Sequence, residues 1–152
     1  MTQRKQALVA ELNRAAREAS GVGNLFASAV AARLGVSPTD VECLGVIESG
    51  ADVTAGDLAR ATGLTTGAVT GIIDRLENAG LARRVRDTED RRKVYVRMTA
   101  AGRAKAGALY GPMGRAMDAL AAKYTAAEIA LLTRYFNESR AVLLAEIARL
   151  NR

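Results

Sequence analysis

The hydrophobic spacing of this chain departs from a helical pattern in one segment, close to its middle, and that segment restricts the fold more than any other feature of the sequence. In residues 54–80 the apolar residues recur every three or four positions, as on one face of a helix. Thr54, with Asp57 three residues on, is the predicted start of a short helix, and Gly63 separates this helix from a second one. The spacing then becomes two in residues 82–86 and again in residues 94–98, as in β-strands. The sequence therefore predicts two helices in series, followed by a hairpin.

The sequence before residue 54 predicts two helices. Apolar residues at helical spacing predict a first helical region over residues 5–34, with a kink where Gly21 and Gly23 interrupt the pattern. Ser37, which a proline follows, is the predicted N-cap of a second helix that runs to Gly50.

The chain after the hairpin reads as two further helices. Thr99 begins a long alanine-rich helix to about Tyr124, and we expect a bend near Pro112, which cannot donate a backbone hydrogen bond. Thr125 and Glu128 form a capping box at the start of the last helix, whose apolar residues fall close to a period of 3.5, as in a helix that packs along another helix. The fold class expected is mainly α with a small β-hairpin wing: a winged helix-turn-helix with about six helices.

Residues 54–80 have the spacing of a helix-turn-helix. Gly63 permits the positive φ of the turn, and the second helix opens at Thr65 or Thr66 and runs to Ala79. Its exposed face is predicted to carry small, hydrogen-bonding and basic side chains, namely Thr66, Gly67, Thr70, Gly71, Asp74 and Arg75. Such a face suits close approach to a DNA groove. The alternative is two ordinary packed helices, in which the glycines are tolerated at a cost of about 1 kcal/mol each.

The positive charge of the chain is concentrated in the hairpin. The sequence has 22 Lys and Arg against 16 Asp and Glu, a net charge of +6, and residues 75–105 alone hold ten basic and four acidic side chains. A solvated basic face is the alternative interpretation of such a run. A basic hairpin after a helix-turn-helix is, however, the arrangement of a winged helix, whose wing reaches a minor groove that attracts arginine.

Residue types that are missing exclude several classes of protein. With no His and one Cys, the chain has no Ser-His-Asp or Cys-His chemistry, no ordinary zinc site and no intramolecular disulfide. We therefore expect no catalytic residues, no metal and no cofactor, and we rank an enzyme last. No apolar run approaches a membrane span, and the charged start after Gln3 does not resemble a signal peptide. A soluble cytoplasmic protein without a membrane partner is expected.

The central residues, taken together, resemble the MarR family of winged helix-turn-helix transcriptional regulators. The matching motifs occur in order: Asp57-Leu58-Ala59 through Gly63-Leu64, Ala68-Val69-Thr70, Asp74-Arg75-Leu76-Glu77, Gly80-Leu81, the run from Asp87 to Val96, and Thr99-Ala100-Ala101-Gly102. The resemblance implies a triangular homodimer with DNA-binding lobes at two corners and interleaved N- and C-terminal helices at the third. Residues 1–36 and 100–152 would then serve dimerisation, and residues 37–99 would form the DNA-binding domain.

The resemblance also implies which residues contact double-stranded DNA. The recognition helix, residues 65–79, would enter the major groove, and the wing, residues 82–98, would enter the minor groove. Asp90 and Arg92 match a family motif in which the carboxylate orients the arginine, although Asp90 also suits a simple turn. Arg75 matches a DNA-contacting position, with a surface ion pair as the alternative. The residues expected to form the DNA site are Thr65, Thr66, Gly67, Ala68, Thr70, Arg75, Arg86, Asp90, Arg91, Arg92 and Lys93.

The function expected from this reading is that of a repressor of a pseudo-palindromic operator, released by a small-molecule effector such as a phenolic or another amphipathic anion. The effector, which only the resemblance supplies, would bind between the dimerisation helices and the DNA-binding lobe. Phe26 is a possible lining residue but suits the core equally. Cys43 is expected to be inert packing, because no cation near it in the sequence lowers its pKa, and redox sensing is the alternative. The competing function is a winged helix for protein contact or non-specific DNA binding, without an effector.

Overall fold

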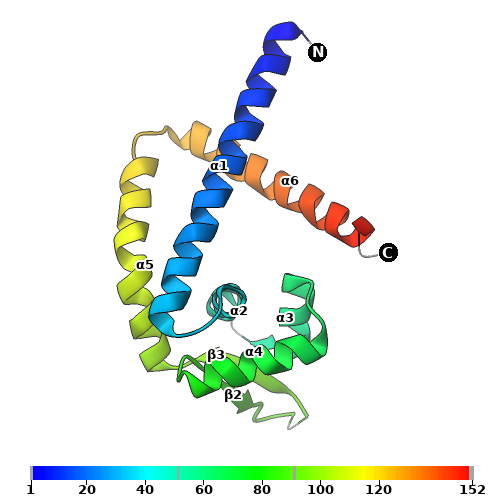
Figure 1. Ribbon diagram of the computed structural model, residues 1–152, viewed down its shortest axis with the longest axis vertical. Coiled ribbons are helices and arrows are strands. Elements are labelled where there is room, and N and C mark those ends of the chain that lie inside the picture. The colour runs from blue at the N-terminus through cyan, green and yellow to red at the C-terminus, as the bar shows by residue number, and fades with distance from the viewer. Residues whose placement is uncertain (1, 51, 91, 151–152) are drawn as a thin grey trace. The chain divides into compact units, whose positions relative to one another are not determined.

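A computed structural model describes residues 2–50, 52–90 and 92–150 of the chain. Figure 1 shows its helices and strands. The chain divides into two compact units, Met1–Leu109 and Tyr110–Arg152. The helices are α1 (Gln3–Leu34), α2 (Pro38–Ser49), α3 (Ala55–Thr62), α4 (Thr66–Asn78), α5 (Ala100–Ala121) and α6 (Ala126–Leu150), and the strands are β1 (Val53–Thr54), β2 (Ala82–Arg86) and β3 (Val94–Met98).

The predicted helix starts are present as local hydrogen-bonded caps. Ser37 and Asp40 form a capping box at α2, and Thr54 and Asp57 form another at α3. Thr125 and Glu128 bond in the same way at α6. Each cap joins residues three apart in the sequence, which is why the sequence alone predicts them.

The helices are continuous at the two places where the sequence predicts a kink or a bend. The helix α1 continues through both of its glycines, Gly21 and Gly23. The helix α5 likewise continues through Pro112 and ends at Ala121, a little before the predicted end.

The strands form a three-stranded antiparallel sheet in the order β1-β3-β2. The hairpin β2–β3 was predicted, with Ala82 opposite Met98 and Arg86 opposite Val94. The strand β1 was not predicted, since two residues are too few to show a period, and it pairs Val53 with Val96.

One hydrophobic core holds the helix-turn-helix and the sheet together. Its fully buried side chains come from α2, α3, α4 and the segment that enters the hairpin: Cys43, Leu58, Val69, Leu76 and Leu81. The apolar residues that recur at helical spacing in α4 are all buried, as expected: Val69, Ile72, Ile73 and Leu76. The core therefore fixes α3, α4 and the hairpin as one winged helix-turn-helix, and Figure 1 shows α4 next to β2.

The start of α5 is joined to the end of α4. The Thr99 hydroxyl donates a hydrogen bond to the Gly80 carbonyl at 2.7 Å and accepts one from the Gly102 amide at 2.8 Å, while the Thr99 amide donates to the Leu81 carbonyl at 3.0 Å. A Cβ added to Gly102 would lie 2.1 Å from the Leu81 carbonyl oxygen. The Thr-x-x-Gly pattern thus combines a helix cap with a backbone contact that only glycine permits.

Candidate nucleic-acid interface

The helix α4 presents an exposed face that carries only small side chains at its start. Thr65 caps it by accepting a hydrogen bond from the Ala68 amide at 3.3 Å, so the helix begins at Thr66, the second of the two predicted starts. The side chains of Thr66, Ala68 and Thr70 are exposed. The Thr70 hydroxyl donates to the Thr66 carbonyl at 3.0 Å, which leaves the hydroxyl oxygen free to accept.

Gly67 lies on this same face with open space in front of it. A Cβ added there would meet no heavy atom within 4 Å among its surroundings. The absence of a side chain at this position therefore serves no internal packing, and another molecule can approach the backbone closely.

The wing turn is ordered by its own acidic residue. The Asp87 carboxylate accepts hydrogen bonds from the amides of Asp90 and Glu89, each at 2.7 Å, and these bonds hold its pKa below the ordinary value. The Asp87 amide donates to the Lys93 carbonyl at 3.0 Å, and the Lys93 amide donates to the Asp90 carbonyl at 2.8 Å. The turn thus has a defined shape before any partner binds.

The tip of the wing carries the pair of residues that the sequence singled out. The Asp90 carboxylate accepts from the backbone amide of Arg92 at 3.1 Å and from its Nε at 3.2 Å. The Arg92 side chain is 92% exposed, so its guanidinium is oriented and yet accessible. Arg86 and Lys93 are also exposed, while Arg91 lies outside the described residues.

Arg84 joins the wing to α4, a role that was not predicted for it. Its guanidinium forms ion pairs with Asp74, at 2.8 Å, and with Glu77, and its backbone amide donates to the Glu77 carboxylate at 2.7 Å. The positive charge of Arg84 is therefore paired with two carboxylates of α4 at the protein surface. This contact fixes the strand β2 against the helix.

Side chains of β3 make a further set of contacts. The Arg97 guanidinium pairs with Asp52 at 2.5 Å and lies 5.8 Å from the centre of the Tyr95 ring, a cation–π distance. Desolvation, together with the nearby Asp87 carboxylate, raises the pKa of the Tyr95 hydroxyl. The strand β3 is thus connected through Arg97 to the segment that precedes β1.

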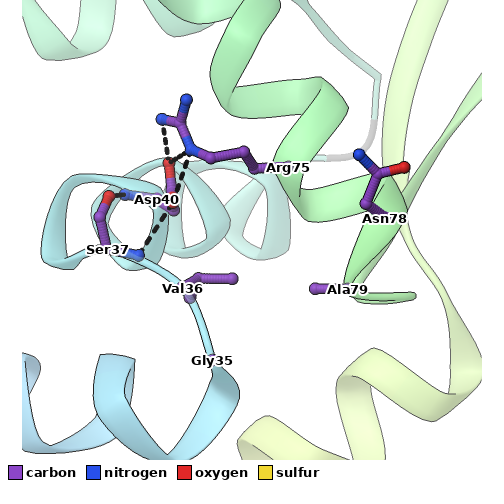
Figure 2. A pocket seen from close by; sticks show the side chains of 7 residues that line it. All are labelled: Gly35, Val36, Ser37, Asp40, Arg75, Asn78 and Ala79. Atoms are coloured by element: carbon purple, nitrogen blue, oxygen red, sulfur yellow. Dashed lines mark hydrogen bonds and ion pairs between the residues drawn. The ribbon is translucent and has the colours of Figure 1, made fainter.

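The Arg75 side chain of α4 is half exposed, but its guanidinium is turned towards α2. Its guanidinium bonds to Asp40 of α2 through Nη2 at 2.7 Å and through Nε at 3.1 and 3.2 Å, as Figure 2 shows. Burial alone raises the pKa of the Asp40 carboxyl, but the hydrogen bonds from Arg75 and Ser37 outweigh it and hold the pKa below its ordinary value. The ion-pair alternative for Arg75 is therefore present, with a partner 35 residues away.

A pocket of about 470 Å³ lies beside this pair. Its lining comes from the α1–α2 junction and the last turn of α4: Gly35, Val36, Ser37, Asp40, Arg75, Asn78 and Ala79.

Cys43 is completely buried. Burial, together with the negative charges of Asp40 and Glu42, raises the pKa of its thiol to about 11. A thiol in such surroundings is packing, as expected from the sequence.

Two absences among the described residues bear on function. These residues contain no group of three or more Cys, Asp or Glu side chains arranged to hold a metal ion. None of the helices they form has the length and apolar character needed to cross a membrane.

Comparison with known proteins gives consistent matches. A sequence model of the MarR family matches residues 22–93. YcgE of Bacillus subtilis (strain 168), an HTH-type transcriptional regulator, is 34% identical over 126 residues, which are 83% of this chain and 82% of that protein. A MarR family protein from Bacillus stearothermophilus has a TM-score of 0.68 at 22% identity, over 94% of this chain and 98% of that one. A mutant of S. aureus MepR, solved bound to an oligodeoxyribonucleotide, has a TM-score of 0.58 at 19% identity, over 87% and 97%.

Proposed function

The chain belongs to the MarR family of DNA-binding transcriptional regulators, and we propose that it represses transcription as a homodimer bound to a pseudo-palindromic operator in double-stranded DNA. As a member of this family it is a regulator and not an enzyme. One observation carries the proposal. Arg84 joins the wing to α4, a helix with an exposed face of small side chains, and the tip of the wing presents an oriented arginine, Arg92. Its place of action would be the cytoplasm.

The DNA face in this proposal has two parts. The first part of α4 enters the major groove, where Thr66 and Thr70 offer hydroxyl and methyl groups to base edges and Gly67 allows close approach. The wing follows the adjacent minor groove with Arg92, and Arg86 and Lys93 contact phosphates. Because Asp90 already orders Arg92, less side-chain entropy is lost on binding. The proposed DNA face also includes Arg91 in the wing, as expected from the sequence, and Thr65 and Ala68 at the start of the helix.

Exposed apolar side chains on the terminal helices support the homodimer. All residues of α6 are described, and none is buried. Large apolar side chains on this helix are nevertheless numerous: Ile129, Leu131, Leu132, Phe136, Val142, Leu143, Leu144, Ile147 and Leu150. Leu8, Leu12 and Leu25 of α1 are likewise exposed. A single chain in water gains nothing from such faces, whereas burial against a second copy contributes roughly 25 cal/mol per Å².

The effector is the remaining part of the proposal. A pocket of about 470 Å³ is within the range of small-molecule sites, and this one lies where α1 meets the DNA-binding part of the chain. An amphipathic anion bound in this region would change how α4 is held and release the operator.

DNA selection and salt titration test the proposal. Duplexes selected from random sequence by the full chain should share a pseudo-palindrome with half-sites about 10 bp apart. Arg92→Ala should weaken binding to that duplex and reduce the salt slope by about one unit, while Lys105→Ala, the loss of an exposed lysine on α5, should leave both unchanged. Equal binding by Arg92→Ala and the wild type would contradict the wing contact. Selection without any shared sequence would favour the non-specific module.

The homodimer and the effector have their own tests. Leu143→Lys should lower the mass in sedimentation from dimer to monomer, whereas Glu138→Lys, at a polar position of the same helix, should remain dimeric. A panel of phenolic acids and other amphipathic anions should then release the bound duplex; a panel without effect would remove the effector from the proposal.

A further inference from the structure

The Asp40 carboxylate is a fully buried charge whose hydrogen bonds come from the N-cap of its own helix, α2, and from α4. At the N-cap, the Ser37 amide donates to Oδ2 at 2.9 Å. From α4, Arg75 donates through Nη2 to Oδ1 at 2.7 Å and through Nε to Oδ1 at 3.2 Å and to Oδ2 at 3.1 Å. Figure 2 shows the three residues together. The same carboxylate thus caps the start of α2 and holds the last turn of α4.

Arg75 is turned across the surface of its own helix towards this carboxylate. Its Nη1 lies 3.6 Å from the point where a Cβ on Gly71 would stand, so the guanidinium runs beside the α4 backbone. The side chain is 54% exposed, but its Nε and Nη2 donors are both used. To reach a phosphate with this fork, Arg75 would have to leave Asp40 without a charged partner in the protein interior.

The energetic balance opposes such a move. Removing one partner of a buried ion pair is strongly unfavourable, because the other charge stays desolvated. A contact between a surface arginine and a DNA phosphate, in contrast, replaces the water around the guanidinium with a phosphate that is itself hydrated. Salt weakens such a contact. The pair with Asp40 is therefore expected to persist when DNA binds.

We propose that Arg75 is a positioning residue, which acts through Asp40 to set the recognition helix α4 against α2, and that it does not neutralise a phosphate. This inference rests on the proposed DNA-binding function and replaces the direct DNA contact expected for Arg75 from the sequence. The fork geometry matters as much as the charge, because only a guanidinium donates from two nitrogens to one carboxylate in this way.

The experiment compares single and double variants of the full chain on the duplex that the wild type selects from random DNA. Arg75→Lys keeps the charge and removes the fork, Arg75→Gln removes both, and Asp40→Asn removes the partner. Glu42→Gln, which neutralises an exposed carboxylate on the same helix, is the matched control. For each variant the affinity of the folded protein is measured across a salt series, and circular dichroism gives the folded fraction.

Positioning through Asp40 predicts one pattern. Arg75→Lys, Arg75→Gln and Asp40→Asn should each weaken binding roughly tenfold, with the salt slope unchanged, and the double variant should be no weaker than either single variant. The Glu42→Gln control should bind like the wild type.

Other patterns overturn the inference. A direct phosphate contact predicts that Arg75→Lys binds like the wild type and that Arg75→Gln lowers the salt slope by about one unit. Wild-type affinity in Asp40→Asn would equally contradict positioning, and if that variant does not fold, the two Arg75 variants still decide between the patterns. Failure of the wild type itself to select DNA would contradict the proposed function instead, so the two failures are distinguishable.

Discussion

Gly102 of α5 packs directly on the backbone of Leu81, at a distance where an added Cβ would stand 2.1 Å from the carbonyl oxygen and 2.8 Å from the carbonyl carbon. Both atoms belong to the backbone, so no side-chain rotation relieves the overlap. Gly102→Ala should therefore lower the free energy of unfolding by about 3 kcal/mol, at the upper end of the usual cost of overpacking.

The control for this prediction is on the same helix. Gly107 has no heavy atom within 4 Å of an added Cβ, so Gly107→Ala should raise stability by up to about 1 kcal/mol through helix propensity alone. Urea unfolding of both variants provides the comparison. Equal effects at the two positions would mean that the backbone contact is absent.

The Arg84 bridge should matter more for DNA binding than for stability. Because Arg84 is partly exposed, Arg84→Met should cost only about 1 kcal/mol of stability. The wing would nevertheless lose its connection to α4, and the affinity for the selected duplex should fall several-fold. Arg83→Met, on the neighbouring exposed residue of β2, removes the same charge without this bridge. If the two variants bind DNA equally weakly, lost charge and not lost geometry explains the effect.

Cys43 should resist alkylation in the native protein. With a thiol pKa of about 11, roughly one molecule in a thousand is ionised at pH 8, and the side chain has no exposed surface. Iodoacetamide followed by mass measurement should show labelling in urea and almost none without it. Rapid labelling of the native protein would show that the core around α2 opens readily.

Acid should remove the stability that Asp40 contributes. The pKa of this carboxyl in the folded protein is below its ordinary value of 3.8, so the contribution is complete above pH 3.8 and is lost as the pH falls through the lower folded-state pKa. Asp40→Asn should cost about 2 kcal/mol at pH 7, less than a fully buried pair because Arg75 is half exposed, and close to nothing once the pH is below the folded-state pKa of Asp40.

The difference in unfolding free energy between the wild type and Asp40→Asn isolates the contribution of the Asp40 carboxyl. Asp57 and Asp87 also have lowered pKa values, but they are present in both proteins and cancel in the comparison. Chemical unfolding at several pH values measures the difference. A constant difference over the whole range would show that the Asp40 charge does not contribute.

Features that depend on neighbours in the sequence were predictable here, and features that depend on packing were not. The boxes of Ser37 with Asp40 and of Thr54 with Asp57 span three residues, so residue types alone indicate them. The bond from Arg75 to Asp40 spans 35 residues, and the sequence offers several carboxylates at comparable distance.

The wing shows the same division. Residue spacing predicted the hairpin, and the resemblance to the MarR family predicted the Asp90–Arg92 pair; both are local in the sequence and both are present. It did not reveal that Arg84 is used internally, because that depends on which carboxylates of α4 face β2. Simple counts of positive charge therefore overstate what the wing offers to DNA.

The bonds around Thr99 limit how this protein can be divided or recombined. The Thr99 hydroxyl accepts a hydrogen bond from the Gly102 amide and donates one to the Gly80 carbonyl. These two bonds connect the first turn of α5 to the segment between α4 and β2. A chimera that joins residue 99 to a foreign helix keeps the hydroxyl and discards its amide partner and the glycine contact. Grafts of this DNA-binding module onto another scaffold need their junction beyond Gly102, and insertions between β3 and α5 will be tolerated less well than changes of length in the wing turn.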